Sequence, residues 1–114
     1  MGTDFPMAKP PRSPNHGARE TISARLRELR PLLEAHGVVH AAIFGSVARG
    51  DDIAASDVDI LLEDRPERRI DLFALMAIRE LLEGQIGRHV DLGIRASLRP
   101  GKHDHIIAEL SEVF

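Results

Sequence analysis

Two short segments of this 114-residue sequence alternate apolar and acidic side chains, and this alternation constrains the fold more than any other feature. In residues 57–63 apolar side chains fall at every second position, and Asp57 and Asp59 fall between them. Residues 89–94 repeat the pattern around Asp91. Because successive side chains of a strand point to opposite faces, both segments are predicted to be strands with one apolar face and one carboxylate face.

The remaining apolar periodicity predicts helices and a further strand. Helical spacing of apolar residues predicts a helix over 19–36, kinked or split at Pro31 because proline removes a backbone N–H, and ended near Gly37. A strand is predicted over 38–44. A second helix, opened by Pro66 and closed near Gly84, is predicted over 70–82. Its apolar face, which should cover a sheet, consists of Ile70, Phe73, Ala77 and Leu81. A closing helix is predicted over 102–114.

This order predicts a small α/β (α+β) sandwich. A mixed β-sheet would be covered by helices on its apolar face, and the carboxylate face would stay open. Residues 1–17 contain four prolines and two glycines, which predicts a disordered leader ahead of one folded domain over 18–114.

Composition narrows the function classes. No apolar run approaches the 18 or so residues of a membrane-spanning helix, and the N-terminus lacks a secretory signal, so a cytoplasmic location is expected. The formal charge of -3 argues against a broad nucleic-acid-binding face. The absence of cysteine excludes disulfides, thiolate metal sites and cysteine nucleophiles.

The Gly45-Ser46 pair follows the predicted strand 38–44 directly. Small residues in such a turn let backbone N–H groups approach phosphate oxygens, and the Ser46 hydroxyl adds a donor. Asp57 and Asp59, ~7 Å apart on one strand face, can ligate the same cation or adjacent cations, and their hard oxygen ligands suit Mg²⁺. If the two carboxylate strands are neighbours, Asp91 converges with Asp57 and Asp59. One of the three carboxylates can then bridge a second metal ion or take the proton of an acceptor hydroxyl.

The segment FGSVARGDDIAASDVDILLE, Phe44 to Glu63, resembles the signature of the minimal nucleotidyltransferase (MNT) family of the DNA polymerase β superfamily, with Gly-Ser, ten residues and then Asp-x-Asp. The downstream segment VDLGI resembles the strand that carries that family's third carboxylate. The resemblance implies a polymerase β palm-like nucleotidyltransferase fold. It also implies that Gly45 and Ser46 bind the triphosphate, that Asp57 and Asp59 bind Mg²⁺, and that Asp91 completes the catalytic set.

The same resemblance implies a partner. Many relatives of this length are antitoxins paired with HEPN-domain ribonuclease toxins, and the transferase moves AMP from ATP to a tyrosine of the toxin. The short length of the chain is consistent with an acceptor that a partner protein presents. Because the chain contains no tyrosine, it is not its own tyrosine substrate. The sequence therefore favours a Mg²⁺-dependent nucleotidyltransferase, an antitoxin with ATP as substrate and two metal ions in the site.

Two other functions stay open at this stage. One is a binding module that neutralises a partner by surface contact without catalysis. The other is a transferase that acts on a small molecule or an RNA end; the short chain disfavours it, and the acidic balance further disfavours the RNA version. Some charged residues also have two interpretations. Arg49 either steers phosphate or forms a surface ion pair, whereas Asp51 and Asp52 are predicted to lie on a solvated loop.

Overall fold

The computed structural model describes residues 17–114, so all but the last residue of the predicted leader lies outside the described residues. The elements, in chain order, are α1 (Ala18–Glu28), α2 (Arg30–Ala35), β1 (His40–Phe44), α3 (Gly45–Arg49), β2 (Val58–Glu63), α4 (Leu72–Ile86), β3 (Val90–Ile94), the short 3₁₀ helix η2 (Arg95–Ser97), α5 (Asp104–Glu109) and β4 (Ser111–Glu112).

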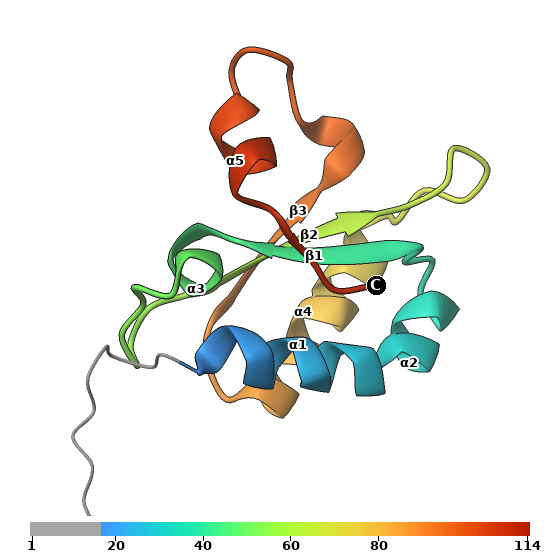
Figure 1. Ribbon diagram of the computed structural model, residues 1–114. Coiled ribbons are helices and arrows are strands. Elements are labelled where there is room, and N and C mark those ends of the chain that lie inside the picture. Colours follow the sequence, from blue (N-terminus) through green and yellow to red (C-terminus); the bar gives the residue numbers. More distant parts are fainter. Residues whose placement is uncertain (1–16) are drawn as a thin grey trace, which may run out of the picture.

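The four strands form one mixed sheet in the order β3-β2-β1-β4. β1 pairs antiparallel with β2 and with β4, whereas β2 and β3 are parallel. The parallel pair is connected through α4, which lies with α1 and α2 on one face of the sheet (Figure 1). The predicted fold class, a small mixed sheet with helices over its apolar face, is confirmed.

The core lies between this sheet face and the three helices. The alternating apolar residues of the strands point into it, as predicted, and meet the buried residues of the helices. Its most deeply buried members are Leu26, Leu33, Ile43, Val47, Val58, Ile60, Leu62, Ile78 and Leu82. Because the apolar strand residues are committed to this core, the acidic residues between them face the other side.

The predicted first helix is split at the predicted place. α1 ends before Leu29, and Pro31 stands in the first turn of α2, where its missing N–H would have no helical partner anyway. Leu26 and Leu33 on either side of the break are both fully buried, so the split keeps both segments on the core.

The bounds predicted for α4 were wrong at both ends. The helix begins at Leu72 rather than at Ile70, and its N-cap is Asp71, whose side chain accepts a hydrogen bond from the Ala74 N–H at 2.8 Å, rather than a turn opened by Pro66. It ends at Gly87, which has a φ of 80°, rather than near Gly84. An N-cap carboxylate and a left-handed glycine give stronger helix ends than the proline and glycine chosen from the sequence.

The apolar face predicted for this helix is correct for Ile70 and Leu81, which pack partly buried against the core, and wrong for the other two residues. Phe73 is 81% exposed and Ala77 is exposed, whereas Ile78 and Leu82 are fully buried. Apolar residues occur around most of this helix, so periodicity alone does not identify the face that contacts the sheet. The consequence is an exposed apolar surface formed by Leu72, Phe73 and Met76.

The predicted closing helix over 102–114 is present only over residues 104–109, and a short strand follows it. α5 ends at Glu109, and the chain then pairs with β1 through β4. The Val113 N–H donates to the Ala41 carbonyl at 2.9 Å, and the Val113 side chain is buried. Helical spacing suggested Val113 as part of a helix, but the unpaired edge of β1 offers backbone hydrogen bonds that an extended segment satisfies.

The carboxylate face is more covered than predicted. Ala42 and Leu61 point to that face and are both buried, and η2 and α5 lie on the same side of the sheet (Figure 1). The exposed part includes Asp57 and Asp91, with Asp59 half-buried beside them. No helix within residues 17–114 is long and apolar enough to cross a membrane.

The orientation of α4 predicts contrasting effects of two truncations on one helix. Ile78→Ala should lower the free energy of unfolding by about 2–5 kcal/mol because it leaves a cavity in the core. Phe73→Ala should change it by no more than about 0.5 kcal/mol because Phe73 is exposed. Urea unfolding followed by circular dichroism measures both values, and a loss for Phe73→Ala equal to that for Ile78→Ala would contradict the observed face.

Candidate active site

The strand register places three site positions in one row across the sheet. Phe44, the last residue of β1, pairs with Asp59 of β2, and Asp59 pairs with Asp91 of β3. Asp57 stands immediately before β2 and shares its face with Asp59. The structure therefore brings Asp91 beside the Asp-x-Asp pair, and the chain turns into Gly45 at the end of the same row.

Gly45 is required at this turn for two reasons. Its φ of 73° lies in the left-handed region, which side chains rarely adopt. A Cβ at this position would also overlap Oδ2 of Asp59 and lie 3.1 Å from its Cγ. The Asp59 carboxylate thus lies directly against the backbone of the Gly-Ser turn, a contact that the linear spacing of the motif does not reveal.

Ser46 lies in the first turn of α3, a five-residue helix that begins directly at Gly45. Phe44, at the N-cap position, is extended and supplies no side-chain hydrogen bond to the first N–H groups. Val47 and Ala48 are buried and fix α3 to the core, while Ser46 is half-buried. The expected helix start is present, and its first N–H groups have no side-chain cap.

The carboxylates are close enough to influence one another. The pKa of Asp59 is raised, first by burial and then by the negative charges of Asp91 and Asp57, while Arg49 acts in the opposite direction. Burial and like charge both disfavour an ionised carboxylate. A cation bound in this region would lower that electrostatic cost.

The side chains do not form a closed metal cage. Within residues 17–114, no group of three or more His, Cys, Asp or Glu side chains converges so that it could hold one ion. Mg²⁺ is commonly bound by only one or two carboxylates together with substrate phosphates and water. The donor set of Asp57, Asp59 and Asp91 therefore fits a metal ion shared with a bound triphosphate.

Arg49 has the surface ion pairs that were one of its two predicted interpretations. Its guanidinium contacts Asp51 at 3.2 Å and Glu109 of α5 at 3.1 Å. It also lies near enough to Asp59 to oppose the rise in that residue's pKa. The C-terminal helix is thus connected by charge to the side of the sheet that carries the site.

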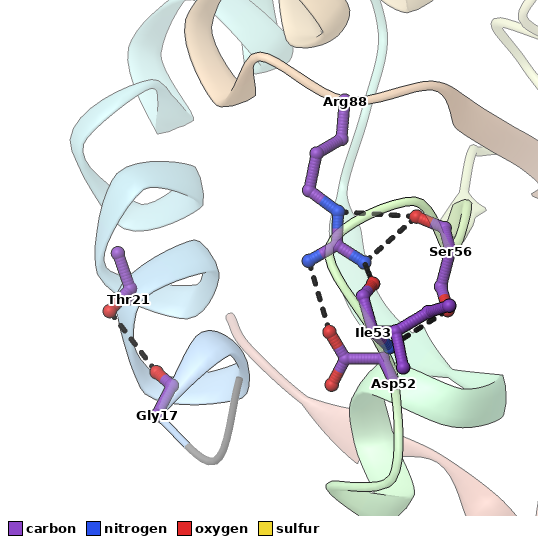
Figure 2. Close-up of polar contacts among 6 residues, drawn as sticks. All are labelled: Gly17, Thr21, Asp52, Ile53, Ser56 and Arg88. Atoms are coloured by element: carbon purple, nitrogen blue, oxygen red, sulfur yellow. Dashed lines mark hydrogen bonds and ion pairs between the residues drawn. The ribbon is translucent and has the colours of Figure 1, made fainter. Parts of the chain in front are cut away.

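The expectation for the loop after α3 holds for Asp51 but is wrong for Asp52. Asp51 is exposed, whereas Asp52 is fully buried and paired with Arg88 at 3.0 Å (Figure 2). Arg88 was not singled out from the sequence, because no motif or periodicity connects it with a loop 36 positions away. Only the parallel pairing of β2 with β3 brings the two residues together.

A sequence profile described as the nucleotidyltransferase domain matches residues 20–112. The chain belongs to this family. It is similar to the "Putative protein adenylyltransferase" of Methanocaldococcus jannaschii, with 37% identity over 76% of this chain and 91% of that protein. It is also 35% identical to the protein adenylyltransferase MntA of Thermococcus cleftensis over 78% of this chain and 85% of that one. The chain is therefore an enzyme of the nucleotidyltransferase type.

Solved structures agree with this family. A structure titled "Structure of putative minimal nucleotidyltransferase" has a TM-score of 0.69 and 32% identity, and covers 82% of this chain and 93% of its own. A Shewanella oneidensis complex of a tri-AMPylated HEPN toxin with an MNT antitoxin has a TM-score of 0.63 and 14% identity, with 84% and 71% coverage. The second likeness shows the fold. Enzymes of this family typically use a nucleoside triphosphate and a divalent metal ion.

The raised pKa of Asp59 predicts a gain in stability when its charge is removed. In metal-free buffer at neutral pH, Asp59→Asn should raise the thermal midpoint, because the ionised carboxylate is more costly in the folded chain than in the unfolded chain. The gain should shrink as the pH falls through the raised pKa, where the native Asp59 becomes protonated. Thermal melts with a chelator measure this.

Asp51→Asn is the matched control, because Asp51 is exposed and its charge is paired with Arg49. No gain in midpoint is expected for this variant. A lower midpoint for Asp59→Asn than for the native protein at neutral pH would contradict the proposed crowding of negative charge.

Proposed function

We propose that this protein transfers AMP from ATP to a hydroxyl group of a partner protein in a Mg²⁺-dependent reaction, and that it is the antitoxin of a HEPN toxin pair. The observation that carries the proposal is the row formed by the Gly45-Ser46 turn, Asp59 and Asp91, with Asp57 on the same face. The kinship with two protein adenylyltransferases supports a protein acceptor.

In the proposed reaction, the N–H groups and hydroxyl of the Gly45-Ser46 turn bind the β- and γ-phosphates. Asp57 and Asp59 would hold two Mg²⁺ ions on this face of the sheet, with Asp91 as the third carboxylate. Bound Mg²⁺ would neutralise charge on the attacking, non-bridging and leaving oxygens. The acceptor oxygen forms a bond to the α-phosphorus, the bond from that phosphorus to the bridging oxygen breaks, and pyrophosphate leaves.

In the proposed reaction Asp91 receives the acceptor's proton. It is exposed, it lies on the edge strand of the sheet, and it neighbours Asp59 without being buried by it. A carboxylate within reach of the attacking hydroxyl acts as a general base when it is ionised. An acceptor approaching from this edge of the sheet would meet Asp91 before the half-buried Asp59.

The surface beside Asp91 supports a protein acceptor. A groove of about 160 Å³ is lined by residues of α4 and β3, including Leu72, Met76 and Asp91. It connects the third carboxylate with the exposed apolar surface formed by Leu72, Phe73 and Met76. Exposed clusters of large apolar side chains are typical of surfaces that bind other proteins.

A transfer assay tests the proposed reaction. The protein is incubated with α-labelled ATP, Mg²⁺ and its proposed HEPN partner, and the labelled products are separated by electrophoresis. Label should appear on the partner, and Asp57→Asn plus Asp59→Asn should abolish it. Asp51→Asn, which alters an exposed carboxylate close in sequence, should retain transfer.

The same variants decide between transfer and simple binding. If the Asp57→Asn plus Asp59→Asn protein still neutralises the partner's activity fully, the protein acts as a binding module and the proposed mechanism is wrong. An unlabelled partner, with Mg²⁺ and ATP present, would lead to the same conclusion.

The apolar surface on α4 predicts a separation between nucleotide binding and transfer. Phe73→Ser plus Met76→Ser should lower transfer to the partner about tenfold or more, because truncating central apolar contacts of an interface costs about 1–2 kcal/mol or more. Binding of ATP with Mg²⁺, measured by calorimetry, should not change. Leu32→Ser, at an exposed apolar residue of α2, is the control. Equal transfer by the native and double-variant proteins would contradict docking at this surface.

A further inference from the structure

Arg88 lies in the short connection between α4 and β3, and its guanidinium reaches into the loop that leads to Asp57 (Figure 2). It donates to the Ser56 carbonyl from Nε at 3.1 Å and from Nη2 at 2.8 Å, and to the Ile53 carbonyl at 2.9 Å. Its Nη1 donates to Oδ2 of Asp52 at 3.0 Å. One side chain therefore joins three residues of the same loop.

The loop is also closed on itself. The Ser56 N–H donates to the Ile53 carbonyl at 2.9 Å, and the Ile53 N–H donates to the Ser56 hydroxyl at 3.0 Å. Because Arg88 binds both carbonyl groups of this turn, it holds the turn as a unit rather than one residue of it. Asp57 is the next residue of the chain.

These contacts fix the backbone of Asp57 from both sides. The carbonyl of Ser56 before it is held by Arg88, and the N–H of Val58 after it donates to the His89 carbonyl at 2.8 Å. Arg88 and His89 are consecutive and directly precede β3, which carries Asp91. The position of Asp57 is thus set relative to the strand that bears the third carboxylate.

The Asp52–Arg88 ion pair is poorly explained by stability alone. Asp52 is fully buried, and its second oxygen, Oδ1, is buried without a hydrogen-bond partner in the described part of the chain. Burying an ion pair costs desolvation that its attraction often fails to repay, and an unpaired buried oxygen adds to that cost. The pair does neutralise the Arg88 charge, so that the guanidinium can bind carbonyl groups near the carboxylates without competing for them.

We propose that Arg88, neutralised by Asp52, is a positioning residue that holds Asp57 in the geometry needed for metal binding. The inference rests on the proposed function, because it assumes that Asp57 is a metal ligand. A planar guanidinium presents several donors at fixed angles, whereas a lysine ammonium at the end of a flexible chain cannot span the same three acceptors. Arg88 acts through Asp57 and does not itself touch the nucleotide.

Metal binding measures this role directly. Free Mn²⁺ is followed by electron paramagnetic resonance as each protein is titrated with Mn²⁺ in the presence of a non-hydrolysable ATP analogue. Arg88→Lys and Asp52→Asn should each raise the Mn²⁺ dissociation constant about tenfold or more, as is typical when a residue that orients a metal ligand is changed. Arg68→Lys is the matched control, because Arg68 also holds a backbone carbonyl, that of Ala35 at 2.7 Å, away from the carboxylates.

Each outcome is decisive. If the native protein binds no Mn²⁺ with the analogue, the proposed function itself fails. If the native protein binds Mn²⁺, and Arg88→Lys and Asp52→Asn bind it with dissociation constants within twofold of the native value, the positioning role is wrong. Thermal midpoints are measured for all proteins. At comparable thermal midpoints, Arg88→Lys and Asp52→Asn must each lose more Mn²⁺ affinity than Arg68→Lys does; an equal loss would also contradict the positioning role. If neither Arg88→Lys nor Asp52→Asn is folded at low temperature, Arg88 is needed for the fold rather than for the site, and the proposal is overturned.

Discussion

The site depends on the register of β2 between its two neighbours. Pairing with β1 places Asp59 beside Phe44 and hence against the turn at Gly45, while pairing with β3 places Asp59 beside Asp91. A slip of one residue in either pair would turn the carboxylates toward the core and expose the apolar residues. The burial of every second residue of β2 therefore stabilises both the fold and the alignment of the site, and the two cannot be separated by mutation of the core.

The same register concentrates negative charge. Asp59 is partly buried and lies next to two further carboxylates. Its carboxylate also lies against Gly45, a contact that is possible only because glycine has no side chain. Such an arrangement is costly in the free protein, and the proposed binding of a cation would offset that cost. Functional sites commonly accept this kind of local cost because the rest of the fold supplies the stability. In this chain the apolar face of the sheet supplies it, on the opposite side from the carboxylates.

Strand alternation was sufficient to predict the two carboxylate strands, their apolar face and their carboxylate face, because burial of one face dictates a period of two. It left open whether the two strands are neighbours, which is what brings Asp91 beside Asp59. Features that depend on contacts between distant segments were not predictable. The outward face of α4 with Phe73 and the pairing of the last residues with β1 both depend on which neighbouring surfaces are left to cover. The burial of Asp52 depends on Arg88, which reaches it only after β2 and β3 have paired. The site residues themselves stay predictions, supported by register, charge and kinship.

The most direct measurement is a crystal structure of the protein with Mn²⁺ and a non-hydrolysable ATP analogue, using anomalous scattering to locate the metal. Anomalous density should lie against the carboxylates of Asp57 and Asp59, with the phosphates at the first N–H groups of α3 and with Asp91 facing the α-phosphorus. Mn²⁺ bound elsewhere, or phosphates away from Gly45 and Ser46, would contradict the assignment of this row as a nucleotidyl-transfer site.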